Sequence, residues 1–229
     1  MPRRVRAPCL PPLLAPLALA LAPARAWAHP GQALEPHDLA SAWTWDPWIV
    51  LPLLASGWLY ARGAERLWRR SGPGRGVRRW EAGCFAAGWL VLAAAMVSPL
   101  HALGEALFAG HMVQHVLLMA VAAPLLVLGR PVIPFLWGVP MGWRRGVGGW
   151  ARGGRVRAAW GALTALSAAW LLHAAAIWLW HLPSLYQATL ASDAVHTLQH
   201  LSFLGTALLF WWVLLHGRGR RTGYGAAVL

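Results

Sequence analysis

Five long apolar runs constrain this chain more than any other feature of its sequence. They lie at about residues 47–63, 82–100, 106–128, 158–181 and 194–215. A helix needs about 20 apolar residues to cross the hydrocarbon core of a bilayer, and each run approaches that length. The composition agrees, because 58% of the residues are hydrophobic and only 12% are charged. The expected fold class is therefore all-α, a polytopic transmembrane helix bundle with about five spans.

The charged residues between these runs predict the topology of the bundle. The segments 62–79 and 130–157 carry seven and six Arg, whereas 29–46, 98–105 and 181–193 contain acids and no Arg. By the positive-inside rule, the N-terminus of the mature chain then lies outside the plasma (inner) membrane of a bacterium-like cell. The net charge of +13 does not indicate nucleic-acid binding, because the Arg residues form short blocks between the spans.

Both ends of the chain carry additional features. Three Arg precede a short apolar run at 13–22, and Ala26 and Ala28 form an A-x-A cleavage site. This pattern predicts a signal peptide at 1–28 and a multi-span membrane domain at 29–229. An uncleaved first span is the alternative, because prolines and Arg25 flank the apolar run. At the other end, residues 222–229 resemble the start of a further apolar span, and a truncated span and a short variant of the protein are the two interpretations.

Histidines recur inside the apolar runs. Two pairs are written alike, as His111-Met-Val-Gln-His115 and His196-Thr-Leu-Gln-His200. Residues four apart share one face of a helix, which allows two imidazoles to approach one ion. Ionisable side chains are costly within a bilayer, so they indicate function. We expect these pairs to bind a metal ion, and hydrogen bonding between helices without a metal is the alternative.

These histidines concentrate in the halves of the spans that face outward. With a rise of 1.5 Å per residue, six of them are expected between the outer surface and a depth of about 15 Å: His181, His196, His111, His200, His173 and His115. Such a funnel predicts a site that is loaded from outside. Neutral imidazole suits copper, zinc, iron and nickel, and the spans contain almost no carboxylates that would favour harder ions.

Several runs of the sequence resemble the polytopic CtaG family, whose members are assembly factors of caa-type cytochrome c oxidases. These runs are 98–105, 111–124 with the first HxxQH motif, Trp180-His-Leu-Pro183, and the second motif. The resemblance implies a role in maturing a terminal oxidase, with insertion of copper into its catalytic subunit. The ligands that it implies are the matching His101, His111, His115, His181, His196 and His200. His173 joins the expected metal ligands through its depth alone.

Three classes of function remain compatible with the sequence. In the first, the protein is not an enzyme, and it passes copper to the catalytic subunit of a cytochrome c oxidase by ligand exchange. The second is a haem-binding membrane protein for electron transfer or haem modification, because His111 and His200 lie at similar depths on different helices. The third is a metal or proton transporter, which would need polar groups in the inner halves of the spans. The sequence leaves the oxidation state of the metal and the oligomeric state open.

Overall fold

The described residues, 41–217, form helices and the turns between them, and the computed structural model contains no strand in that range. The predicted all-α class is confirmed. The expected signal peptide at 1–28 and the apolar residues 222–229 lie outside the described range. In chain order the helices are α2 (Pro47–Ser71), α3 (Arg79–Val97), α4 (Pro99–Ala106), α5 (Phe108–Val116), the π-helix η1 (Leu117–Ala122), α6 (Ala123–Leu128), α7 (Val132–Gly138), α8 (Met141–Ala151), α9 (Gly154–Leu163), α10 (Leu166–Trp180), α11 (Pro183–Ala191) and α12 (Asp193–His216).

Three helices are long and apolar enough to cross a membrane, which identifies a membrane protein. They are Arg79–Val97, the continuous Phe108–Leu128 and Asp193–His216. The expected span at 158–181 is not one straight helix, because α9 and α10 meet at a bend of 66°, and together they can form a fourth span. At this bend the hydroxyl of Thr164 donates to the carbonyl of Trp160, which competes with the helical hydrogen bonds. The expected span at 47–63 lies within α2, which is not among these candidates, so a total of five remains a prediction.

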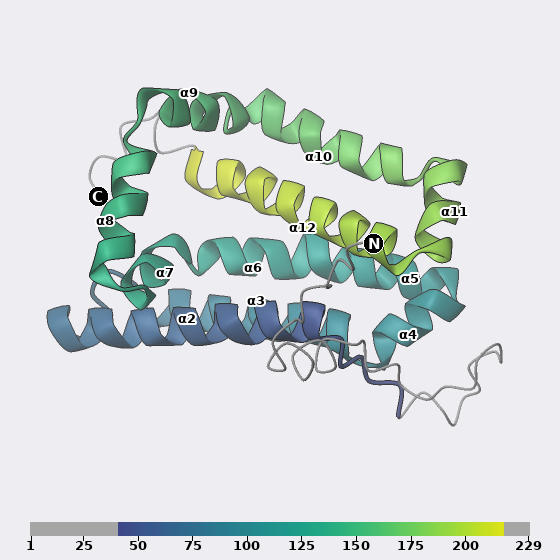
Figure 1. Ribbon diagram of the computed structural model, residues 1–229, viewed down its shortest axis with the longest axis horizontal. Coiled ribbons are helices and arrows are strands. Elements are labelled where there is room, and N and C mark those ends of the chain that lie inside the picture. The colour runs from purple at the N-terminus through teal and green to yellow at the C-terminus, as the bar shows by residue number, and fades with distance from the viewer. Residues whose placement is uncertain (1–40, 218–229) are drawn as a thin grey trace, which may run out of the picture.

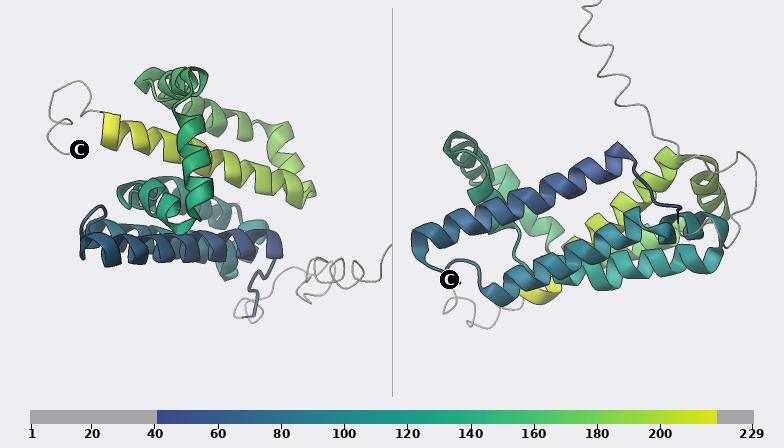
Figure 2. Two further views of the ribbon diagram at one scale, coloured as in Figure 1. Left: turned by 60° about the vertical axis from the view of Figure 1, so that its left-hand side comes forward. Right: turned by 90° about the horizontal axis from the view of Figure 1, so that it is seen from below.

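The long helices lie side by side, and short helices cross the two ends of the bundle (Figures 1 and 2). α3 packs against η1 and α6, which in turn contact α12, and α10 covers the outer side of α12. Two apolar clusters bind α2 to this group, one around Leu53 and Leu118 and one around Tyr60 and Phe85. The short α4 and α11 lie at one end, and α7 and α8 lie at the other.

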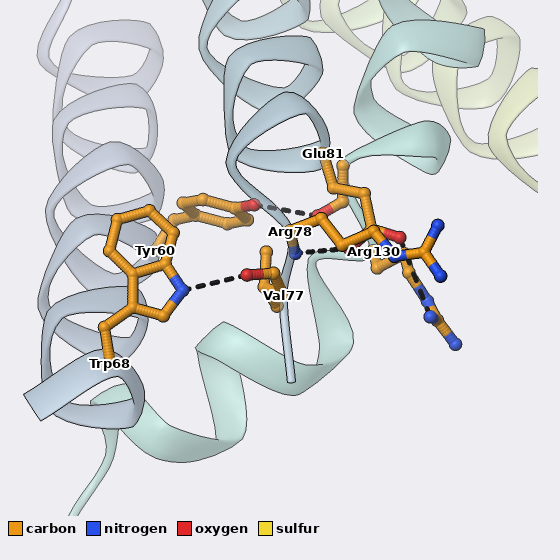
Figure 3. Close-up of polar contacts among 7 residues, drawn as sticks. Tyr60, Trp68, Val77, Arg78, Glu81 and Arg130 are labelled. Atoms are coloured by element: carbon orange, nitrogen blue, oxygen red, sulfur yellow. Dashed lines mark hydrogen bonds and ion pairs between the residues drawn. The ribbon is translucent and has the colours of Figure 1, made fainter. Parts of the chain in front are cut away.

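A polar network closes the end of the bundle near α7 (Figure 3). The carboxylate of Glu81 accepts a hydrogen bond from the backbone N–H of Arg78 at 2.7 Å and lies 3.7 Å from the guanidinium of Arg130. The indole of Trp68 donates to the carbonyl of Val77 at 2.8 Å, and the hydroxyl of Tyr60 donates to a carbonyl at the end of α6. Glu81 is buried, so the paired Arg130 offsets much of the cost of removing its charge from water.

Pro124 explains why the π-helix η1 forms. The N–H of Ala123 donates to Leu118, five residues back, so the carbonyl of Met119 loses its α-helical partner. The residue five positions after Met119 is Pro124, which has no N–H to take over that role. The indole of Trp211 donates to this freed carbonyl at 2.9 Å, across from α12. The proline that the sequence places inside the third span therefore creates a polar connection between two spans.

Replacing Trp211 by Phe is expected to lower the free energy of unfolding by about 1–2 kcal/mol, because the part-buried carbonyl of Met119 then has no donor. Trp212→Phe is the matched control, since the ring of Trp212 stacks on His216 with 4.5 Å between centroids. Thermal unfolding of the purified protein in detergent measures the difference. Equal losses in the two variants would show that aromatic volume matters here and the hydrogen bond does not.

Candidate metal site

Five histidines gather at the end of the bundle formed by α4 and the first turns of α5 and α12. We call them the five-histidine cluster: His101, His111, His115, His196 and His200. α4 and α5 are separate helices because Leu107 has an extended backbone, with φ −129° and ψ 125°. Gly104 and Gly110 let these two helices touch, since a Cβ at Gly110 would lie 2.9 Å from the carbonyl oxygen of Leu103. This close approach turns α4 back over the start of α5.

The two HxxQH motifs face one another across the α5–α12 contact. Within each motif the ring centroids are 4.2 Å apart for His111 and His115 and 4.3 Å apart for His196 and His200. Between the helices, His111 lies 5.3 Å from His196, and His115 lies 5.3 Å from His200. His101 of α4 stacks on His196 at 5.6 Å with nearly parallel planes. The predicted convergence of imidazoles from separate helices is therefore present in the structure.

These rings are buried and leave polar atoms without partners. His111 is 1% exposed and His115 is 2% exposed, and neither ring nitrogen of either residue has a hydrogen-bond partner. The Nε2 atoms of His196 and His200 are also unpartnered. A buried polar atom without a partner costs about 1–3 kcal/mol, so six such nitrogens are a substantial burden on stability. A metal ion takes one lone pair from each neutral imidazole, so a single ion bound by these four rings would satisfy four of the six nitrogens.

The spacing of the rings fits a single ion, although the rings do not yet surround one. Two imidazoles on one ion, with metal–nitrogen bonds of about 2.0 Å, have centroids about 5 Å apart. The separations of 4.2–5.3 Å within and between the motifs are close to this value. Within residues 41–217, no group of three or more His, Cys, Asp or Glu side chains already surrounds a common ion position. Binding of one ion by three or more of these residues would therefore require the rings to rotate from the positions they have here.

Gln114, the amide of the first motif, orients His101. In a helix the carbonyl of Ala95 would bond to residue 99, but Pro99 has no N–H. The amide nitrogen of Gln114 donates to the Ala95 carbonyl instead, at 2.7 Å, and lies 3.0 Å from Nδ1 of His101. An amide nitrogen can only donate, so Nδ1 accepts, and a neutral His101 carries its proton on Nε2. His101 thus presents a donor, and the lone pairs come from the other four histidines.

The two remaining predicted ligands, His181 and His173, lie outside the five-histidine cluster, and His181 is the nearer of the two. His181 is exposed at the end of α10, where its Nδ1 lies 2.7 Å from the carbonyl of Ile177. Its ring lies 6.4 Å from Phe203, which also packs against His115, so one aromatic ring separates it from the cluster. His173 lies further along the bundle, where it bonds to Thr206 at 3.0 Å and stacks on Phe210.

Sequence reasoning missed two residues that border the cluster. Tyr186 of α11 places its ring 5.8 Å from His111 and covers the end of the site. Phe203, which is fully buried, lies beneath His115 at 4.7 Å. Phe203 follows His196 and His200 by seven and three residues, so helical spacing alone could have placed it on their face. The position of Tyr186 depends on the fold of the α11 segment, for which the sequence offers no comparable periodicity.

The fold and the cluster define an all-helical membrane protein in which histidines from candidate membrane-spanning helices converge. A family model described as cytochrome c oxidase caa3 assembly factor matches residues 58–229. The chain therefore belongs to this family of oxidase assembly factors, as the resemblance of its motifs predicted. Neither a curated protein nor a solved structure was found to match the chain.

Proposed function

We propose that this protein binds a copper ion through His111, His115, His196 and His200 and delivers it to the catalytic subunit of a caa-type cytochrome c oxidase. Membership of the assembly-factor family supports the oxidase as the partner. The observation that carries the copper proposal is the set of buried, unpartnered imidazole nitrogens on two facing helices. Delivery is an exchange of ligands, in which nitrogen–copper bonds form and break while the covalent bonds of the polypeptide stay intact. It requires no catalytic residue.

Access to the site is expected from the end of the bundle that carries α4 and α11. His196 lies near this end of the bundle, and the exposed His181 lies at the same end. The ring of Phe203 contacts both His181 and His115. The arginine-rich α8 lies across the opposite end (Figure 1). The positive-inside rule assigns the arginine-rich end to the cytoplasm, which places the histidines towards the outer face of a bacterial inner membrane. In this arrangement the exposed His181 receives copper first, and the four deeper histidines retain it.

The short distances between the histidine rings favour the binding of a single metal ion over the binding of a haem. His111 and His200, the pair considered for axial ligation, have centroids 6.4 Å apart. His115 lies within 5.3 Å of both rings, and His196 does also. A porphyrin between His111 and His200 would have to pass through these neighbours, whereas one ion needs no such slot.

The copper content of the purified full-length protein tests the proposal. After incubation with copper and removal of excess metal, we expect about one copper per chain by elemental analysis, with no Soret absorbance. A chain that retains no copper above a detergent blank would overturn the proposal. A Soret band in protein isolated from cells would replace it with the haem-binding alternative.

A further inference from the structure

The short helix α8 has almost no support from the rest of the protein. It runs crosswise to the long helices at the end of the bundle and connects α7 to α9 (Figures 1 and 2). None of its residues is buried, and its principal helical neighbour is α9. A helix of 11 residues is marginal in water without tertiary packing, so α8 requires another surface to stabilise it.

The sequence of α8 separates an apolar side from a basic side. Trp143, Val147 and Trp150 follow at i, i+4 and i+7, so they share one face. They are 73%, 45% and 70% exposed, respectively. Arg145 lies on the opposite side of the helix, by its position in the 3.6-residue turn. Exposed aromatic rings on one face and arginine on the other are typical of helices that lie in a membrane interface.

The charge around α8 is entirely positive over a continuous stretch. From residue 141 to residue 163 there is no acid, and five basic residues occur: Arg144, Arg145, Arg152, Arg155 and Arg157. The guanidinium of Arg144 lies over the ring of Trp137 in α7, 4.6 Å from its centroid, which anchors α8 at one point. No ion pair to another residue is found for the remaining four among the described residues.

We propose that α8 lies on the surface of the membrane and binds the headgroups of anionic phospholipids. Its crosswise orientation places it in the plane of the interface, because the long helices define the membrane normal. The indoles of Trp143 and Trp150 enter the interface, and the arginines from 145 to 157 contact phosphate groups. Each basic side chain near an anionic surface contributes about 1 kcal/mol at most, so several together produce a measurable preference. This surface is independent of the histidine cluster and of the copper proposal.

The preference can be measured in reconstituted full-length protein with spin-labelled lipids. Electron paramagnetic resonance gives the share of labelled phosphatidylglycerol and of labelled phosphatidylcholine that is immobilised by the protein. The variant Arg145→Gln/Arg152→Gln/Arg155→Gln should lower the preference for phosphatidylglycerol about threefold or more. The control variant Arg70→Gln/Arg75→Gln/Arg79→Gln removes the same charge from exposed residues near the α2–α3 turn. It should lower the preference by less than half as much. Equal effects, or no effect of the α8 variant, would overturn the proposal.

A second measurement does not depend on removing any arginine. In a Cys9→Ser/Cys84→Ser background, a nitroxide at Val147→Cys should be accessible to oxygen dissolved in lipid, and a nitroxide at Gly149→Cys to a water-soluble nickel complex. This pattern would support insertion of the apolar face. If both positions are equally accessible to the nickel complex, α8 stands in water, and a docking surface for a soluble protein becomes the better explanation.

Discussion

The variant His115→Leu/His200→Leu is expected to lose copper binding and to gain stability as an apoprotein. Both histidines are buried, and three of their ring nitrogens have no partner. Leucine has a similar volume and no polar atom, so the replacement removes the unmet hydrogen bonds and should raise the free energy of unfolding by about 2 kcal/mol. Copper affinity should fall about 100-fold or more, because loss of a residue that only orients a metal ligand already costs about 10–100-fold and this variant removes two proposed ligands.

Competition with a chromophoric copper(I) chelator measures the affinity, and thermal unfolding of the metal-free protein measures the stability. The matched control is His216→Leu, which changes a histidine at the far end of α12, where Nδ1 is also unpartnered. It should leave copper affinity within about threefold of the unchanged protein. If the double variant retains its copper affinity, these histidines do not bind copper. If it loses stability instead, the imidazoles make stabilising contacts in the metal-free protein, and the unmet hydrogen bonds are not a burden.

The substitution Gly63→Ala is expected to have the largest effect on stability. A Cβ at Gly63 would overlap the carbonyl oxygen of Pro134 and would lie 2.9 Å from the amide nitrogen of Gly138. These are backbone atoms of α7, so a rotamer change cannot relieve the clash, and α7 must move away from α2. Overpacking of this kind costs about 3 kcal/mol.

The control for Gly63→Ala is Gly205→Ala, which should raise the stability of the protein and not lower it. A Cβ at Gly205, within α12, meets no atom within 4 Å. Gly205→Ala should therefore stabilise the helix by about 0.5–1 kcal/mol, through the higher helix propensity of alanine. Unfolding temperatures of the two purified variants test the contrast. If Gly63→Ala unfolds at the temperature of the unchanged protein, α2 and α7 are not in contact as described.

The core of the candidate site could be predicted because it depends on local periodicity. His111 and His115, and again His196 and His200, are four residues apart on helices that the apolar runs predict, so each pair had to share a face. That the two faces meet is a tertiary fact. It depends on how the helices pack, and the exact position of the α4–α5 turn at Leu107, near the start of the run 106–128, is likewise not given by local periodicity. The role of Gln114 depends equally on Pro99, which frees the carbonyl that holds its amide.

Two other features could not be predicted from hydropathy alone: the length of α2 and the direction of the His173 side chain. The first expected span ends at residue 63, yet α2 continues to Ser71. Its arginines remain helical because long side chains reach polar partners beside the apolar surface. Arg66, for example, donates to the carbonyls of Trp137 and Gly138 at the end of α7. His173 was predicted to be a ligand from its depth, but depth does not fix the direction of a side chain. Its ring instead meets Thr206 on α12.

In the proposed site, imidazoles from α5 and α12 hold one copper ion together. X-ray absorption at the copper edge of the loaded, full-length protein tests it most directly, because scattering from imidazole rings is distinct from that of water or sulfur. The proposed site should give a first shell of nitrogen with the outer-ring scattering of three or four histidines, and this signal should be lost in His115→Leu/His200→Leu. A shell of oxygen or sulfur, or an unchanged spectrum in that variant, would contradict it.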